Sequence, residues 1–240
     1  MKAIVLAAGY ATRLYPLTLD TSKMLLDVGG RPMVDYVLDA LDPVEGLDRI
    51  YLVTNAKFAP QFEDWAPAAV TVIDDGTTSE DDRLGAIGDI GFVLERTGLD
   101  DDLIVVAGDN LFTAGIEGFV ALGREKEAPV LAVHDIGDPA LMSNYNTTVV
   151  DDEGRITYFE EKPERAESTL AGTALYYYPR HALPLIRQYL AEGNNPDQPG
   201  RLVEWLYPRT PFYVWQLPGD WYDIGSPDQL EQARAVFGAK

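Results

Sequence analysis

A chain of 240 residues, 46% of them hydrophobic, is long enough to bury a substantial core and suits one large domain or two small ones. Its formal charge of -20 argues against wholesale nucleic-acid binding, which depends on basic patches. The absence of cysteine excludes disulfides, thiolate nucleophiles and cysteine-based zinc sites. No run approaches the roughly 20 apolar residues of a membrane span, and the amino terminus does not read as a signal peptide. We therefore expect a cytoplasmic protein that binds neither membranes nor nucleic acid.

In the first half of the chain, short apolar runs predict strands, and apolar residues at helical spacing predict helices between them. The predicted strands are Lys2–Ala7, Ile50–Val53, Val70–Ile73 and Leu103–Ala107, and the predicted helices are Met33–Leu41, Phe58–Trp65 and one beginning near Arg83. This alternation predicts an α/β fold with a mostly parallel sheet covered by helices on both faces.

The second half changes character, because strand-like runs follow one another with short turns. The predicted strands are Val130–Val133, Thr147–Val150, Ile156–Glu160 and Ala174–Tyr178, and the later helices are Leu183–Leu190, Gly200–Leu206 and Asp228–Val236. The turn Asp152-Glu153-Gly154 is the clearest hairpin signal. No long linker or repeat divides the chain, so we expect residues 1–240 to form a single domain with a mixed sheet.

The loops that follow the strands are where an open α/β sheet binds ligands. The first, Leu6–Thr18, is rich in small residues that let backbone N–H groups approach a phosphate. Arg13 in this loop, and Lys23 soon after it, are candidate partners for the phosphate oxygens. The loop has neither the P-loop nor the dinucleotide glycine spacing, so a dehydrogenase is not favoured.

Two carboxylates are candidate ligands for magnesium. Asp109 directly follows a buried strand, and a lone Asp there suits half of a magnesium site, although it would also serve as a helix cap. Asp223 lies between aromatic and apolar residues, where an unpaired carboxylate is costly to bury. Although 114 positions separate them, we expect both to reach one metal ion.

Glu161 and Lys162 lie at the end of another predicted strand. Glu161 is a candidate acceptor for sugar hydroxyls and Lys162 a candidate contact for an anion, although most such charged clusters are simply solvated strand ends. His134 and His181 have no companion at ligand spacing and are not expected to be catalytic.

Taken in order, these segments resemble the sugar-1-phosphate nucleotidyltransferases, such as the glucose-1-phosphate thymidylyl- and uridylyltransferases. The matching segments are Leu6-Ala7-Ala8-Gly9 running into Thr12-Arg13-Leu14, Pro16-Leu17-Thr18, Lys23 and Pro32-Met33-Val34, then Gly108-Asp109-Asn110, Glu161-Lys162-Pro163 and Trp221-Tyr222-Asp223-Ile224-Gly225. The resemblance spans nearly the whole chain. It implies a Rossmann-like three-layer sandwich and the transfer of a nucleoside monophosphate from a nucleoside triphosphate to a sugar 1-phosphate, with release of pyrophosphate.

The resemblance also assigns roles to individual residues. Arg13, Lys23 and Lys162 would be catalytic, and Asp109 and Asp223 would hold Mg²⁺. The substrate-binding residues would be Leu6, Ala8, Gly9, Gly85, Asn146, Glu161 and Thr173. The oligomeric state is left open between a monomer and a homo-oligomer.

The chain departs from the family pattern at several positions. Ala11 and Ala174 stand where glycine is usual, and Ser22 stands where proline is usual. Asn146, which follows Tyr145, replaces the glycine that usually follows a tyrosine there. The Gln-containing base-recognition segment is replaced by Asp82–Asp89, so the base is not assigned. Two alternatives stay open: a cytidylyltransferase acting on a non-sugar phosphate such as phosphocholine or inositol phosphate, and a catalytically silent relative that binds nucleotides.

Overall fold

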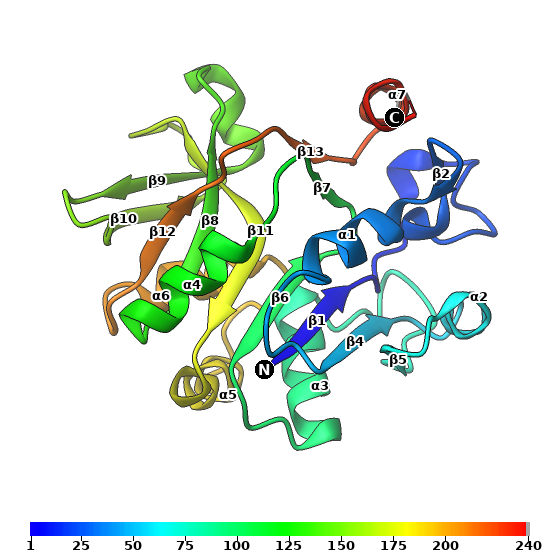
Figure 1. Ribbon diagram of the computed structural model, residues 1–240, viewed down its shortest axis with the longest axis horizontal. Coiled ribbons are helices and arrows are strands. Elements are labelled where there is room, and N and C mark those ends of the chain that lie inside the picture. The colour runs from blue at the N-terminus through cyan, green and yellow to red at the C-terminus, as the bar shows by residue number, and fades with distance from the viewer. Residues whose placement is uncertain (239–240) are drawn as a thin grey trace.

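The computed structural model describes residues 1–238, so the last two residues of the predicted 1–240 domain lie outside the described residues. A seven-stranded sheet forms the centre of the molecule, in the order β12-β8-β11-β6-β1-β4-β5 (Figure 1). Its strands are β1 (Lys2–Leu6), β4 (Arg49–Thr54), β5 (Val70–Asp74), β6 (Leu103–Ala107), β8 (Val130–Asp135), β11 (Leu170–Tyr178) and β12 (Tyr213–Gln216). Strand β11 runs antiparallel to both of its neighbours, whereas the other pairings are parallel. The predicted mixed, mostly parallel sheet is confirmed.

Helices cover both faces of this sheet. They are α1 (Met33–Leu41), α2 (Ala59–Trp65), α3 (Ala86–Thr97), α4 (Glu117–Lys126), α5 (Leu183–Ala191) and α6 (Pro199–Leu206). A further helix, α7 (Pro227–Phe237), packs beside the sheet in a third, smaller apolar cluster. Short 3₁₀ turns occur at Thr12–Leu14, Lys23–Leu25, Pro139–Asn144 and Arg180–Ala182. Across the part of the chain that the structure describes, no helix has the length and apolar character needed to cross a membrane.

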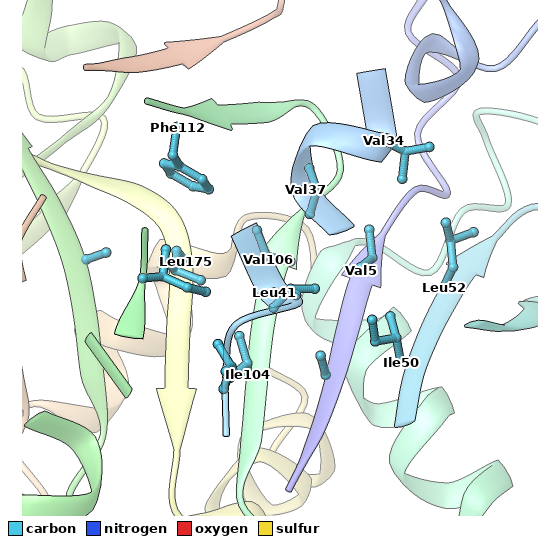
Figure 2. Close-up of a cluster of buried hydrophobic side chains, with 14 of the residues drawn as sticks. Val5, Val34, Val37, Leu41, Ile50, Leu52, Ile104, Val106, Phe112 and Leu175 are labelled. Carbon is cyan, nitrogen blue, oxygen red and sulfur yellow. The ribbon is translucent and has the colours of Figure 1, made fainter. Parts of the chain in front are cut away.

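The alternation of side chains along each strand creates two separate cores. In β1, Ala3 and Val5 face α1, whereas Ile4 and Leu6 face α3 on the opposite side. Figure 2 shows the first core, in which side chains of α1 lie over β1, β4 and β6. Helices α3, α5 and α6 fill the second core. The predicted three-layer sandwich is therefore confirmed, with both faces of the sheet buried as parallel strands require.

Three small antiparallel ribbons extend from this framework. Strand β9 (Asn146–Val150) pairs with β10 (Ile156–Glu161), which confirms the predicted hairpin. Strand β7 (Asn110–Phe112) pairs with β13 (Trp221–Asp223), and β2 (Asp27–Val28) pairs with β3 (Arg31–Pro32). The β7·β13 ribbon joins the middle of the chain to its last quarter, and so brings the two candidate metal motifs side by side.

The structure corrects several boundaries. Helix α3 begins at Ala86, not near Arg83, because Gly85 has a φ of 80° that is incompatible with a right-handed helix. Helix α4 was not predicted, since its two glycines hide the apolar pattern. One of them, Gly123, is required by packing, because a Cβ there would lie 2.3 Å from the ring of Tyr177. Strands β7, β12 and β13 were also missed, as three or four residues carry no periodicity.

Candidate active site

A cavity of about 380 Å³ opens beside the carboxyl ends of β1 and β6. Nine of the predicted site residues line it: Leu6, Ala8, Gly9, Lys23, Gly85, Asp109, Asn146, Glu161 and Asp223. Among the described residues, its lining does not include Arg13, Lys162 or Thr173. The fold therefore gathers motifs from the whole length of the chain into one site, as expected for the crevice of an α/β sheet.

The loop after β1 is held rigidly by the neighbouring strand. Asn55 donates a side-chain hydrogen bond to the Ala8 carbonyl at 2.8 Å, and Thr54 donates to the Ala7 carbonyl at 3.2 Å. A side chain at Gly9 would meet nothing within 4 Å, so the backbone at this residue faces open space. Such an exposed, braced backbone can approach an anionic ligand closely.

Lys23 connects the two candidate metal motifs. Its ammonium group is largely buried, forms an ion pair with Asp109 Oδ2 and donates a hydrogen bond to the Ile224 carbonyl at 2.9 Å. The second oxygen of Asp109 accepts a hydrogen bond from the Asn110 side chain at 2.8 Å. Asp109 is therefore fixed by both of its oxygens, and β13 is anchored to the same lysine.

Asp223 pairs with Asn110 in the β7·β13 ribbon, and Asn110 directly follows Asp109 in the chain. Burial and the negative charge of Asp109 raise the pKa of Asp223 to about 6, against the opposing effects of Lys23 and Arg13. Lys23 alone thus does not neutralise the two carboxylates, and a further cation would be stabilised beside them.

The donors present fit a magnesium ion. Within residues 1–238, no group of three or more His, Asp or Glu side chains is arranged to hold a metal. Magnesium does not require one, because it is commonly bound by one or two carboxylates together with water and substrate phosphates. Asp109 and Asp223 are the two carboxylates available for such a set.

Glu161 closes the opposite wall of the cavity, at the end of β10. Its carboxylate lies against the first turn of α6, where a Cβ on Gly200 would stand 1.8 Å from Glu161 Oε2. Burial raises the pKa of Glu161 to about 7, so that near neutral pH it can both donate and accept hydrogen bonds. Both properties suit sugar hydroxyls.

Asn146 and Thr173 stabilise the irregular strands beside Glu161. The buried Asn146 side chain accepts a hydrogen bond from the Gly172 backbone N–H at 2.7 Å. Thr173 is fully buried and donates its hydroxyl to the Ala132 carbonyl at 3.1 Å. The Thr173 side chain is therefore committed to the sheet and does not face the cavity. Lys162 is exposed, and its backbone N–H donates to the Tyr145 carbonyl at 2.7 Å.

The two alanines that replace glycine both have left-handed backbones. Ala11 has a φ of 50° and Ala174 a φ of 52°, the region that favours glycine. Ala174 lies where the register of β11 with β8 shifts, and Thr18 Oγ1 donates to the Ala11 carbonyl at 2.8 Å. The unusual conformations persist despite the added methyl groups, so neither substitution removes the backbone shape that glycine would allow.

One part of the cavity was missed by sequence analysis. Asp89, on α3, lines the cavity and is only 5% exposed, and Asp75, directly after β5, is 8% exposed. Burial, followed by the charge of Asp75 and a hydrogen bond to it, raises the pKa of Asp89 to about 8. The available signal was the spacing, because Asp89 is four residues after Gly85 and so lies on the same face of the helix.

Comparison with known proteins agrees with this geometry. A family model described as nucleotidyl transferase matches residues 2–238. UTP–glucose-1-phosphate uridylyltransferase from Synechocystis sp. is 30% identical over 252 residues, covering 99% of this chain and 63% of that protein. Glucose-1-phosphate thymidylyltransferase from Streptomyces antibioticus is 30% identical over 249 residues, covering 99% of this chain and 66% of that protein.

A solved structure shares the fold. UDP-glucose pyrophosphorylase complexed with UDP-glucose matches with a TM-score of 0.83 at 18% identity, over 98% of this chain and 97% of that one. The chain thus spans less than two-thirds of the length of the two curated relatives and almost all of the solved one.

Proposed function

Because the chain belongs to the nucleotidyl transferase family, we propose that it transfers a nucleoside monophosphate from a nucleoside triphosphate to a sugar 1-phosphate. The products are a nucleoside diphosphate sugar and pyrophosphate. The observation that carries the proposal is the cluster of Lys23, Asp109 and Asp223, which shares one cavity with the small-residue loop and Glu161. The names of the two curated relatives support a sugar 1-phosphate as the acceptor.

The chemistry requires no protein nucleophile. An oxygen of the sugar 1-phosphate forms a bond to the α-phosphorus, while the bond from that phosphorus to the bridging oxygen breaks. Its electron pair leaves with pyrophosphate. Catalysis then consists of positioning the two substrates and neutralising charge that develops on the phosphates.

The triphosphate would occupy the end of the cavity formed by the loop after β1. Backbone groups of Leu6, Ala8 and Gly9 would contact the nucleotide, and Gly85 would border the base. Arg13 and Lys23 would stabilise the departing pyrophosphate. Arg13 lies outside the cavity lining, but its positive charge opposes the rise in the pKa of Asp223, which supports an electrostatic role at this end of the cavity.

Asp109 and Asp223 would hold Mg²⁺. When bound, this ion would supply positive charge at the α-phosphate. The hydrogen bonds that Asp109 accepts from Lys23 and Asn110 fix its orientation beforehand, so little ordering is left for the moment of reaction.

The acceptor would occupy the Glu161 end. Glu161 would bind sugar hydroxyls, and Lys162 would orient the attacking phosphate. Asn146 would limit the space available to the sugar, because its side chain is locked onto Gly172. For Thr173, the hydrogen bond to Ala132 supports an indirect role, in which it shapes the strand that borders the sugar.

Residues 1–240 would act as one catalytic domain in the cytoplasm. Proteins of that compartment rarely use disulfides, so the absence of cysteine fits this location. The decisive experiment measures pyrophosphate release with ATP, CTP, GTP, UTP and dTTP. Each is paired with sugar 1-phosphates, phosphocholine and inositol phosphate, and Asp223→Asn serves as the inactive control. Release with sugar 1-phosphates supports the proposal, whereas release with non-sugar phosphates alone would favour the rival transferase. Triphosphate binding by calorimetry without any release would show a silent relative.

A further inference from the structure

Two buried carboxyl groups meet at the α3 end of the cavity. Asp75 Oδ1 accepts hydrogen bonds from the backbone N–H and the hydroxyl of Thr77, both at 2.7 Å. Asp75 Oδ2 and Asp89 Oδ1 are sealed from solvent, and no donor among the described residues reaches either of them. The Asp89 carboxyl lies within hydrogen-bonding reach of Asp75. Two buried carboxyl groups this close favour a state in which one proton lies between them.

The hydrogen bonds indicate which aspartate carries that proton. Two donors on Asp75 Oδ1 stabilise negative charge on Asp75, whereas no donor among the described residues reaches Asp89 Oδ1. The raised pKa of Asp89, caused first by burial and then by Asp75, agrees with a neutral Asp89 that donates to Asp75. Its remaining oxygen is then a hydrogen-bond acceptor without a protein partner. Because Asp89 lines the cavity, this acceptor is available to a ligand.

The position of Asp89 points to the nucleobase, and this step rests on the proposed function. Asp109 and Asp223 would mark the reacting phosphates, and Glu161 and Asn146 the sugar. The remaining end is formed by the loop after β1 and the start of α3. There Gly85 packs its backbone directly against Pro196, since a Cβ would lie 2.6 Å from the Pro196 carbonyl oxygen. Asp89 follows one turn later, and its N–H donates to the Gly85 carbonyl at 2.8 Å.

We propose that Asp89, with its proton held by Asp75, selects the base of the triphosphate by accepting a hydrogen bond from an N–H group on the edge of the base. A base that instead presents a carbonyl oxygen or an unprotonated ring nitrogen leaves this buried acceptor unpaired. Such a mismatch costs about 1.4–2.7 kcal/mol, or roughly 10- to 100-fold in discrimination. Asp75 acts as a positioning residue, because it fixes which oxygen of Asp89 faces the cavity.

Three variants separate this role from a purely structural one. Asp89→Asn keeps the pattern, since its NH₂ can donate to Asp75 while its carbonyl oxygen faces the cavity. Asp89→Ala removes the acceptor, and Asp89→Leu does the same with a side chain closer in volume should the alanine variant fail to fold. Asp81→Asn is the matched control, because Asp81 is an exposed carboxylate in the preceding loop and lines no part of the cavity.

The measurement is kcat/KM for each of the five triphosphates with the preferred sugar 1-phosphate, supported by calorimetric binding of the same triphosphates. We expect Asp89→Asn and Asp81→Asn to keep the wild-type order of preference. In Asp89→Ala or Asp89→Leu, the ratio between the best and the second triphosphate should fall at least about tenfold. An unchanged ratio in these variants, or an equal loss in Asp89→Asn, would overturn the assignment. A wild type that releases no pyrophosphate contradicts the proposed function instead, and the calorimetric affinities of the variants then decide the role of Asp89.

Discussion

The proton shared by Asp75 and Asp89 predicts how stability changes with pH in Asp89→Asn. The pKa of Asp89 is raised from its ordinary value of 3.8 to about 8, mainly by burial. Between these limits the folded chain holds a proton that the unfolded chain has lost. The contribution of Asp89 to stability is therefore complete below about pH 3.8 and is lost as the pH rises to about 8. The amide of the variant has no proton to lose and keeps the hydrogen bond to Asp75.

The magnitude follows from the size of the shift. A displacement of roughly four pH units corresponds to at most about 6 kcal/mol, at about 1.4 kcal/mol per unit. Asp89 is 5% exposed, so solvent screening removes little of this. The advantage of Asp89→Asn over the wild type should be small near pH 4.5, grow to a few kcal/mol near pH 8 and then level off. For a chain of this length, that corresponds to a Tm difference of roughly 10 °C.

Thermal unfolding followed by circular dichroism from pH 4.5 to 9 measures this difference. Asp81→Asn removes a formal charge from an exposed position and serves as the control, because the chain carries a net charge of -20 and losing any negative charge reduces self-repulsion. A Tm advantage of Asp89→Asn that does not change with pH, or that equals the advantage of the control, would show that Asp89 holds no proton at neutral pH and would refute the reasoning.

Three further predictions concern the two ends of the cavity. Lys162→Ala should lower kcat roughly 100-fold with little effect on triphosphate binding by calorimetry, whereas Arg13→Ala should weaken that binding as well; equal losses of affinity would contradict the assigned roles. Asn146→Gly should broaden the range of sugar 1-phosphates used and lower Tm by a few degrees, because the buried Gly172 N–H loses its acceptor at a cost of about 1–3 kcal/mol; an unchanged acceptor range would show that Asn146 does not limit the sugar. Ala174→Gly should raise Tm by about 1–3 °C, since relief of the left-handed backbone outweighs the added freedom of the unfolded chain; a lower Tm would contradict this.

The sequence predicted the layers of the fold well because strands buried on both faces are short, uniformly apolar runs. Ile4 and Val5 are such a case, since they face opposite cores and are both fully buried. Helix α4 escaped prediction because Gly123 is present for its contact with Tyr177, which lies on a strand 54 positions later in the chain. Local patterns do not record such a contact.

In the candidate site, too, local patterns predicted single residues but not the contacts between residues far apart in the chain. The order of the motifs indicated Lys23, Asp109 and Asp223 individually, but no local pattern joins Lys23 to Asp109 across 86 positions. That pairing exists because β1 and β6 are neighbours in the sheet. The Asp75 and Asp89 pair was missed for a similar reason. One residue ends a strand and the other lies on a helix, so their contact depends on how α3 packs on the sheet.

The bonds of Lys23 also have a consequence for the order in which the protein becomes functional during synthesis. This one ammonium group joins Asp109 in the middle of the chain to the Ile224 carbonyl, 201 positions from Lys23 itself. A nascent chain can form β1, β4 and β6 early, yet the end of the cavity that holds Lys23 and Asp109 stays incomplete until residue 224 has left the ribosome. Until then Lys23 has only one of its two anchors, and Asp223 is absent from the site. This end of the cavity therefore assembles after β1, β4 and β6, and an intermediate without β13 lacks both Asp223 and the second anchor of Lys23.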